Sequence, residues 1–264
     1  MKTLIIYLAL FSLVLAEPIT LTEKQANFVA MKVWQNEGAG LDKYLVHWND
    51  GEDFASVGIG HFIWFSKNHS EKFQEAFPQV LKFFESKKVN MPTWLNSTTP
   101  LPWNTKKEFY QAKNSNSKKY TDLFQLLKST KGYQAEFLAQ RLNFSLPKML
   151  NAVESSKQKN IIKQRFYQIL NCPDGSINER GLYALLDYVN FKGEGTAESE
   201  QYNGFGWGLL QALENMDTAE TNILKAFAES ADAMLTRRIK NSPLERGENR
   251  WQQNWHNRVM SYWQ

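Results

Sequence analysis

The sequence predicts a mainly helical (α+β) protein with one small β-hairpin. Apolar residues recur at helical spacing over long stretches, including residues 106–170 and 218–240. A single segment, residues 44–59, has two short β-prone runs on either side of a turn signal. No internal repeat or interdomain linker divides the chain. We therefore expect one domain in which the helices form most of the core.

The first predicted helix positions a glutamate at its end. Residues 22–25 (Thr-Glu-Lys-Gln) form a capping-box pattern, and apolar residues follow at helical spacing. Gly38 and Gly40 should end this helix, so Glu37 lies in its last turn. Residues 44–48 and 54–59 then read as two strands joined by an Asn-Asp-Gly turn.

The remaining elements are predicted to be helices and loops. Ser70 should open a helix that has Phe73 and Phe77 on its apolar face and a kink at Pro78. Residues 91–104 are rich in proline and should form a loop. The helical pattern of residues 106–170 has expected breaks near residues 114–117, at residue 132 and at residue 147. An apolar helix over residues 182–189 leads into a glycine-rich segment, and residues 218–240 form a long amphipathic helix.

The N-terminus has the pattern of an export signal. Lys2 supplies a positive charge, an apolar run extends from Leu4 to Ala16, and small residues precede the expected cleavage after Ala16. This run is shorter than the about 20 residues of a membrane-spanning helix. The expected mature chain, residues 17–264, is therefore exported to the periplasm or the medium without an anchor. Cys172 is the only cysteine, so no internal disulfide is possible.

Composition argues against several classes of function. The formal net charge is only +4, and lysine and arginine are spread along the chain, so a nucleic-acid partner is not expected. His47, His61 and His69 have no recognisable metal-ligand spacing, so no metal site is predicted. No phosphate-binding glycine loop or serine nucleophile elbow is present, and no cofactor is expected.

The most informative segment is Ser56-Val-Gly-Ile-Gly-His61, together with Glu37 and Asp50 upstream. In this order these residues resemble the active-site segment of lysozymes of the phage T4 type. The resemblance covers about residues 30–65. Five residues separate Asp50 from Ser56, as in those enzymes, but the twelve between Glu37 and Asp50 are four more than the lysozymes have. Ser56 also stands where those lysozymes have a threonine.

The residues of this segment suit glycoside hydrolysis, which needs a proton donor and a second carboxylate. Glu37 is the candidate acid, because the negative end of a helix dipole should raise its pKa. Asp50, at the hairpin tip, is the candidate partner, and Ser56 could hold a water. The longer first gap leaves Glu52 as an alternative second carboxylate. A structural role is predicted for His61 and for the glycines at positions 58 and 60.

The resemblance implies a lysozyme-like fold, with two helical lobes and the hairpin beside a cleft, and attack on the peptidoglycan glycan. A polymer substrate needs further subsites along the cleft. The candidate residues for its walls are Trp64, Asn190, Glu194, Trp207 and Gln211. Glu194 is also a reserve second carboxylate.

The sequence therefore predicts an exported muramidase-like glycosidase. A non-catalytic module of the same fold that binds cell-wall glycan or a protein remains an alternative, motivated by Ser56 and the altered spacing. A chitosan- or chitin-cleaving enzyme is a second alternative. Hydrolase and lytic transglycosylase chemistry both remain open, as do the role of residues 66–165 and the oligomeric state.

Overall fold

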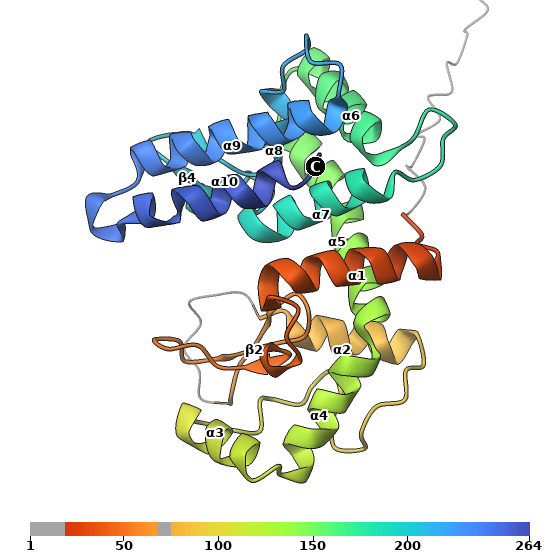
Figure 1. The fold of residues 1–264 in the computed structure, drawn as a ribbon, viewed down its shortest axis with the longest axis vertical. Coiled ribbons are helices and arrows are strands. Elements are labelled where there is room, and N and C mark those ends of the chain that lie inside the picture. The colour runs from red at the N-terminus through yellow and green to blue at the C-terminus, as the bar shows by residue number, and fades with distance from the viewer. Residues whose placement is uncertain (1–18, 68–74) are drawn as a thin grey trace, which may run out of the picture.

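Ten α-helices, five short strands and four short 3-10 helices, joined by loops, lie within residues 19–67 and 75–264, the part of the chain that the computed structural model describes (Figure 1). The mainly helical prediction is confirmed. The helices are α1 (Glu23–Gly38), α2 (Phe77–Ser86), α3 (Lys106–Asn114), α4 (Lys118–Ser129), α5 (Lys131–Asn151), α6 (Ser156–Leu170), α7 (Glu179–Lys192), α8 (Leu209–Glu214), α9 (Ile223–Asn241) and α10 (Gln252–Met260). The strands are β1 (Val46–His47), β2 (Ala55–Val57), β3 (Phe62–Trp64), β4 (Gln201–Tyr202) and β5 (Phe205–Gly206).

Helix α1 begins at the predicted capping box. The Gln25 N–H donates to Thr22 Oγ1 at 3.3 Å, and the Thr22 N–H donates to Gln25 Oε1 at 2.9 Å. Ala39, rather than a glycine, adopts the left-handed conformation after the helix, at φ 50°. Gly38 is the last helical residue, and the Trp34 ring leaves no room there for a Cβ. This glycine therefore serves packing as well as helix termination.

The predicted hairpin is present and has a third strand. Strands β1 and β2 are antiparallel, with His47 opposite Ser56. Strand β3 pairs with β2 on the other side, and Ser56 lies opposite Ile63. The turn predicted at Asp50 and Gly51 joins β1 to β2, and Gly51 has φ 80°. The sequence did not reveal β3, because only four residues separate it from β2.

Three predicted helix boundaries differ from the structure. Pro78 lies in the first turn of α2 and does not kink it. The N–H groups of a first turn have no partner within the helix, so the N–H that proline lacks is not missed there. Ser70 and Phe73 lie outside the described residues, as does His69. The break between α4 and α5 falls at Thr130, and Gly132 is helical. Pro147 lies inside α5, which continues to Asn151.

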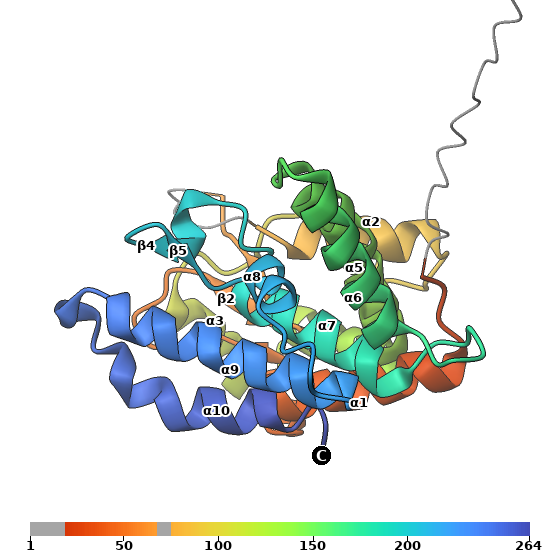
Figure 2. The same cartoon turned by 90° about the horizontal axis from the view of Figure 1, so that it is seen from above.

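Helix α5 connects two parts of the molecule (Figure 1). It runs from the part with the three-stranded sheet and α2–α4 into the part with α6–α10. Helix α1 packs against both α5 and α7 between these parts, and α9 and α10 pack side by side in both views (Figures 1 and 2). One hydrophobic cluster extends through both parts, from Trp64 in β3 to Trp207 before α8. The two parts of the molecule therefore share one hydrophobic core.

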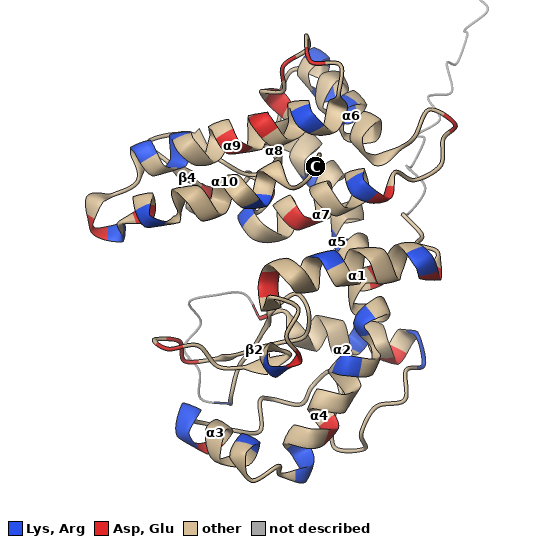
Figure 3. Cartoon of the chain, viewed as in Figure 1, with Lys and Arg blue, Asp and Glu red and all other residues tan. Residues whose placement is uncertain are grey.

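Charged side chains are distributed over both parts. Lysine and arginine are interspersed with acidic residues on most helices (Figure 3). None of the helices within residues 19–67 and 75–264 has the length and apolarity that a membrane crossing requires. The predicted export signal, residues 1–16, lies outside the described part of the chain.

Candidate functional site

The end of α1, the turn before β3 and the end of α7 line one pocket of about 420 Å³. Glu37 reaches it from α1, Gly60 and His61 from the turn, and Asn190 from α7. Arg141 of α5 donates to Asn190 Oδ1 at 3.2 Å and also lines the pocket. The structure thus brings four of the predicted site residues together from distant parts of the sequence.

The Glu37 carboxylate is anchored by an arginine from the end of the chain. Arg258 Nη2 in α10 donates to Glu37 Oε1 at 2.5 Å, and the Glu37 side chain is 19% exposed. The same arginine binds Asp187 of α7 through two atoms, at 2.9 Å from Nε and 2.8 Å from Nη2. Because Asp187 makes the fork-like contact, it balances most of the guanidinium charge. Glu37 shares the arginine through one contact only.

Asp187 is the buried centre of this network. Its side chain is 1% exposed and accepts hydrogen bonds from Tyr262 Oη at 2.6 Å and Asn36 Nδ2 at 3.2 Å, as well as from Arg258. Burial opposes the charge on Arg258, but Asp187 and Glu37 outweigh it and hold the pKa of Arg258 well above its usual range. Burial, with Asp187 nearby, raises the pKa of Tyr262. The guanidinium is therefore a fixed positive charge beside Glu37.

The turn that carries His61 is held by a buried glutamine. Gln134 of α5 is fully buried, and its Oε1 accepts from the Ile59 N–H at 2.8 Å. Gly58 has φ 75°, and a Cβ there would collide with Gln134 Oε1. Gly60 lies against the Phe62 ring with similarly little room. Both glycines therefore permit the close approach that fixes the turn, in keeping with their predicted structural role.

His61 lies beside the Glu37 carboxylate. Its Nδ1 is 3.8 Å from Glu37 Oε2. Burial lowers the pKa of His61, against the opposing effects of Glu37 and Glu52, so the ring is neutral near pH 7. Its Nε2 is buried and has no hydrogen-bond partner among the described residues. A buried nitrogen without a partner in a residue that lines a pocket is a candidate hydrogen-bonding group for a ligand.

The two candidate second carboxylates have different surroundings. Asp50 is fully exposed and pairs with Lys106 of α3, which lowers its pKa. Glu52 is partly buried, accepts from Asn49 Nδ2 at 2.9 Å, and acts electrostatically on His61. Glu52, rather than Asp50, therefore shares the electrostatic environment of Glu37.

Ser56 faces the side of the sheet that borders the pocket. It lies opposite Ile63 in the antiparallel register, and directly paired residues place their side chains on one face. Ile63 lines the pocket. Ser56 itself is 4% exposed and is not among the residues that line the pocket.

The two predicted aromatic subsites are not at the surface. Trp64 is fully buried against Phe77, and its Nε1 donates to the Thr99 carbonyl at 3.0 Å. Trp207 is 4% exposed, packs on Tyr202, and has the Arg238 guanidinium 4.2 Å from its ring centroid. The expectation that these tryptophans line the cleft is therefore wrong. Each fills the core of its own part of the molecule.

Glu194 and Gln211 lie outside the Glu37 pocket. Glu194 accepts from Ser145 Oγ at 3.1 Å and Lys148 Nζ at 2.9 Å on α5. Its burial opposes ionisation, but these two bonds prevail and lower its pKa. Gln211 caps α8 through the Gly208 N–H at 3.0 Å. Neither residue therefore contacts Glu37.

Sequence reasoning missed the arginines of this site and their buried partner. Arg141 and Arg258 lie in helices far from the recognised segment, and a surface arginine has the same local pattern. Asp187 did give a signal, since it is an acid inside the apolar run 182–189. A buried carboxylate needs a cationic partner, so such a run predicts an arginine or lysine elsewhere.

Lys192, the last residue of α7, has its ammonium group close to two aromatic rings. Its Nζ is 3.9 Å from the Phe191 ring centroid and 3.3 Å from that of Trp255. Arg258 covers Phe191 at 4.0 Å, and Arg238 lies 5.0 Å from Trp255. Burial, with these two guanidinium groups nearby, lowers the pKa of Lys192 to about 6 despite the acids Glu248 and Glu37.

Replacing Lys192 with methionine should stabilise the protein, most strongly in mild acid. Between pH 6 and the ordinary lysine pKa of 10.5, the unfolded chain binds a proton that the folded state lacks, so wild-type stability falls as the pH is lowered. We expect Lys192→Met to raise the free energy of unfolding by a few kcal/mol more at pH 6 than at pH 9, at ~1.4 kcal/mol per pKa unit. Urea unfolding at both pH values measures this. Exposed Lys240→Met is the control, and equal gains at both pH values would contradict the prediction.

Metal binding has no support in this geometry. Within residues 19–67 and 75–264, no three His, Cys, Asp or Glu side chains are grouped closely enough to hold an ion.

Comparisons of the chain with protein-family models, with curated proteins and with solved structures found no match. The site itself therefore carries the functional argument.

Proposed function

We propose that this protein is an exported glycoside hydrolase with a lysozyme-like fold that cleaves the glycan backbone of peptidoglycan. The observation that carries the proposal is the Glu37 carboxylate in a pocket between two parts of the molecule, beside a neutral imidazole with an unpartnered nitrogen. Such a pocket can exclude water around an acid and offer hydrogen bonds to a sugar.

Glu37 is assigned as the general acid. It gives its proton to the glycosidic oxygen as the bond to the anomeric carbon breaks, and a water adds to that carbon. The proton of the water passes to a second carboxylate. Arg258 makes two of its three carboxylate contacts to Asp187 and one to Glu37, so a change at Glu37 leaves the guanidinium group paired.

Glu52 is assigned as the second carboxylate in preference to Asp50. We expect Glu52→Gln to lower kcat by about a hundredfold, in the range of a lost general base. Asp50→Asn should stay within about twofold of wild type, since Asp50 is fully exposed and paired with Lys106. Initial rates of reducing-end release measure both variants. A larger loss for Asp50→Asn would reverse the assignment.

The product of digestion tests the proposed reaction. The protein is incubated with purified peptidoglycan, and soluble fragments are identified by mass. Fragments with a reducing-end N-acetylmuramic acid support hydrolysis. Anhydro ends would instead identify a lytic transglycosylase. Release of fragments from chitosan or chitin alone would make that polymer, rather than peptidoglycan, the substrate.

A non-catalytic glycan-binding module is the second candidate. The contact from Arg258 to Glu37 favours it, because it ties the Glu37 side chain to a fixed cation instead of leaving it free to act on a glycosidic oxygen. Sedimentation with insoluble cell wall, without release of reducing ends, would support this candidate. Release of sugar fragments would exclude it.

A further inference from the structure

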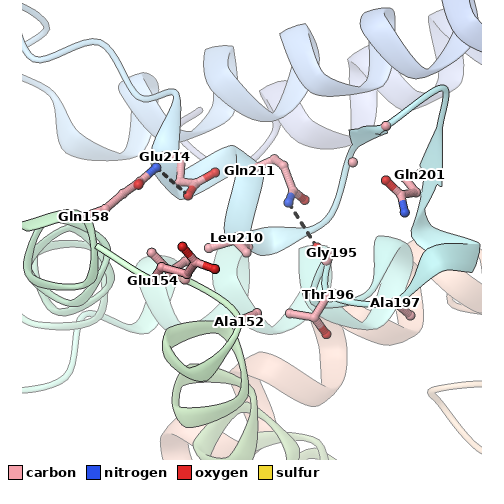
Figure 4. Close-up of a pocket in the computed structure, with 13 residues that line it drawn as sticks. Ala152, Glu154, Gln158, Gly195, Thr196, Ala197, Gln201, Leu210, Gln211 and Glu214 are labelled. Carbon is pink, nitrogen blue, oxygen red and sulfur yellow. Dashed lines mark hydrogen bonds between the residues drawn. The ribbon is translucent and has the colours of Figure 1, made fainter. Parts of the chain in front are cut away.

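A second pocket lies in the C-terminal part of the molecule, between the end of α5, α6, α8 and the loop before β4 (Figure 4). Its volume is about 410 Å³. Glu154, Gln158 and Glu214 lie on one side of it in Figure 4, and Thr196 and Gln201 lie on the other. None of the residues that line the Glu37 pocket belongs to it.

The loop that forms one wall is rigid. Glu200 Oε2 accepts hydrogen bonds from the N–H groups of Gly195, Thr196 and Ala197, at 2.8, 2.8 and 3.0 Å. Gln211 Nε2 donates to the Gly195 carbonyl at 3.0 Å, as the dashed line in Figure 4 shows. A pocket fixed in this way binds a ligand without first ordering its own wall.

The charged residues that line this pocket are acidic. Glu154 and Glu214 are its only charged residues, and no lysine or arginine lines it. Burial raises the pKa of Glu214, against the effects of Gln158, which donates at 3.0 Å, and of Arg237. A bound cation would offset that cost of burial. The lining therefore disfavours anionic ligands and suits a cationic one.

The rest of the lining offers hydrogen bonds. The Thr196 hydroxyl is buried and has no partner among the residues described. Gln201 presents an amide group across from the two glutamates (Figure 4). The wall also includes Gly204, where the lack of a side chain leaves open space. Leu210 supplies an apolar surface. A ligand whose ring carries several hydroxyl groups and has one apolar face would match these hydrogen-bonding groups and this apolar surface.

The second pocket lies along the same stripe of α5 as the Glu37 pocket. Arg141, Ser145, Lys148 and Ala152 are spaced by four, three and four residues, which places them on one helix face. Arg141 lines the first pocket and Ala152 lines the second. At ~1.5 Å per residue, about 16 Å of helix separates these two residues. Both pockets are therefore reached from one side of the helix.

We propose that the second pocket binds an amino sugar whose amine is free and protonated. The ammonium group lies between Glu154 and Glu214, and the ring hydroxyls bind Thr196 and Gln201. An N-acetylated sugar lacks the charge, so the pocket distinguishes deacetylated from acetylated glycan. This binding does not depend on the chemistry of Glu37.

Calorimetric titration with a glucosamine tetramer tests the proposal. The titrated protein carries Glu37→Gln, which should prevent turnover in the other pocket. We expect the glucosamine tetramer to bind at least about tenfold more tightly than the N-acetylglucosamine tetramer. The double substitution Glu154→Gln and Glu214→Gln should remove this preference, and Thr196→Val should weaken both ligands alike.

Two controls make the outcome decisive. Glu229→Gln removes an acid of α9 that does not line the pocket, and it should leave binding unchanged. If the double variant does not fold, the exposed Glu154→Gln alone should still reduce the preference. Equal binding of both tetramers, or a preference that survives these substitutions, would overturn the proposal. Peptidoglycan cleavage by the wild-type protein is measured separately, so either proposal can fail without the other.

Discussion

Replacing Arg258 with methionine should lower the free energy of unfolding by about 3–5 kcal/mol, the usual cost of breaking a buried ion pair. Methionine keeps the inner, aliphatic part of the side chain, but the substitution removes the guanidinium group, with its contacts to Glu37 and Asp187 and its packing on the Phe191 ring. Asp187, at 1% exposure, would then have lost its cationic partner and would keep Tyr262 and Asn36 as donors. That unpaired buried charge is the physical source of the loss.

Urea unfolding measured by circular dichroism gives the free energy, with Arg250→Met as the control. Arg250 is exposed and its guanidinium group lies near the Trp251 ring, so its loss should change stability by less than about 0.5 kcal/mol. In the background of Arg258→Met, Asp187→Asn should cost less than it does in the wild type, because the charge no longer has a partner. A loss below about 1 kcal/mol for Arg258→Met would contradict the account of Asp187 as the centre of the network.

The local part of the site was predictable because its signals lie close together in the sequence. The capping box at Thr22 fixes where α1 begins, and the glycines near position 40 fix where it ends, so Glu37 had to lie in its last turn. The Asp50-Gly51 turn likewise fixed the hairpin. Each of these features depends on neighbouring residues alone.

The distant part of the site was not predictable from such patterns. Asn190 was correctly placed in the Glu37 pocket, but Trp64 and Trp207 were not, since a tryptophan in the core and one in a sugar subsite look alike in sequence. Arg258 reaches Glu37 only because α10 packs on α9 beside α7. Tertiary packing decides these contacts, and the chain pattern near either residue does not encode them.

Glu37→Gln should abolish most glycan cleavage while leaving the fold intact. A general acid contributes about a hundredfold to ten-thousandfold, so we expect kcat to fall by at least about a hundredfold. The amide keeps the shape of the side chain and a hydrogen-bonding oxygen for Arg258, which stays fixed by its two contacts to Asp187. Because the lost interaction acts in the transition state, kcat and kcat/KM should fall together.

Rates of reducing-end release from purified peptidoglycan measure this effect, and retention on insoluble cell wall measures binding in the same samples. Glu23→Gln, at the exposed start of α1, is the matched control and should keep the full rate. A Glu37→Gln protein that cleaves as fast as wild type would refute the acid assignment. If the wild-type protein binds the wall and releases nothing, the contact from Arg258 serves binding. It then positions Glu37 to accept hydrogen bonds from hydroxyl groups of the glycan, and Glu37→Gln should weaken retention.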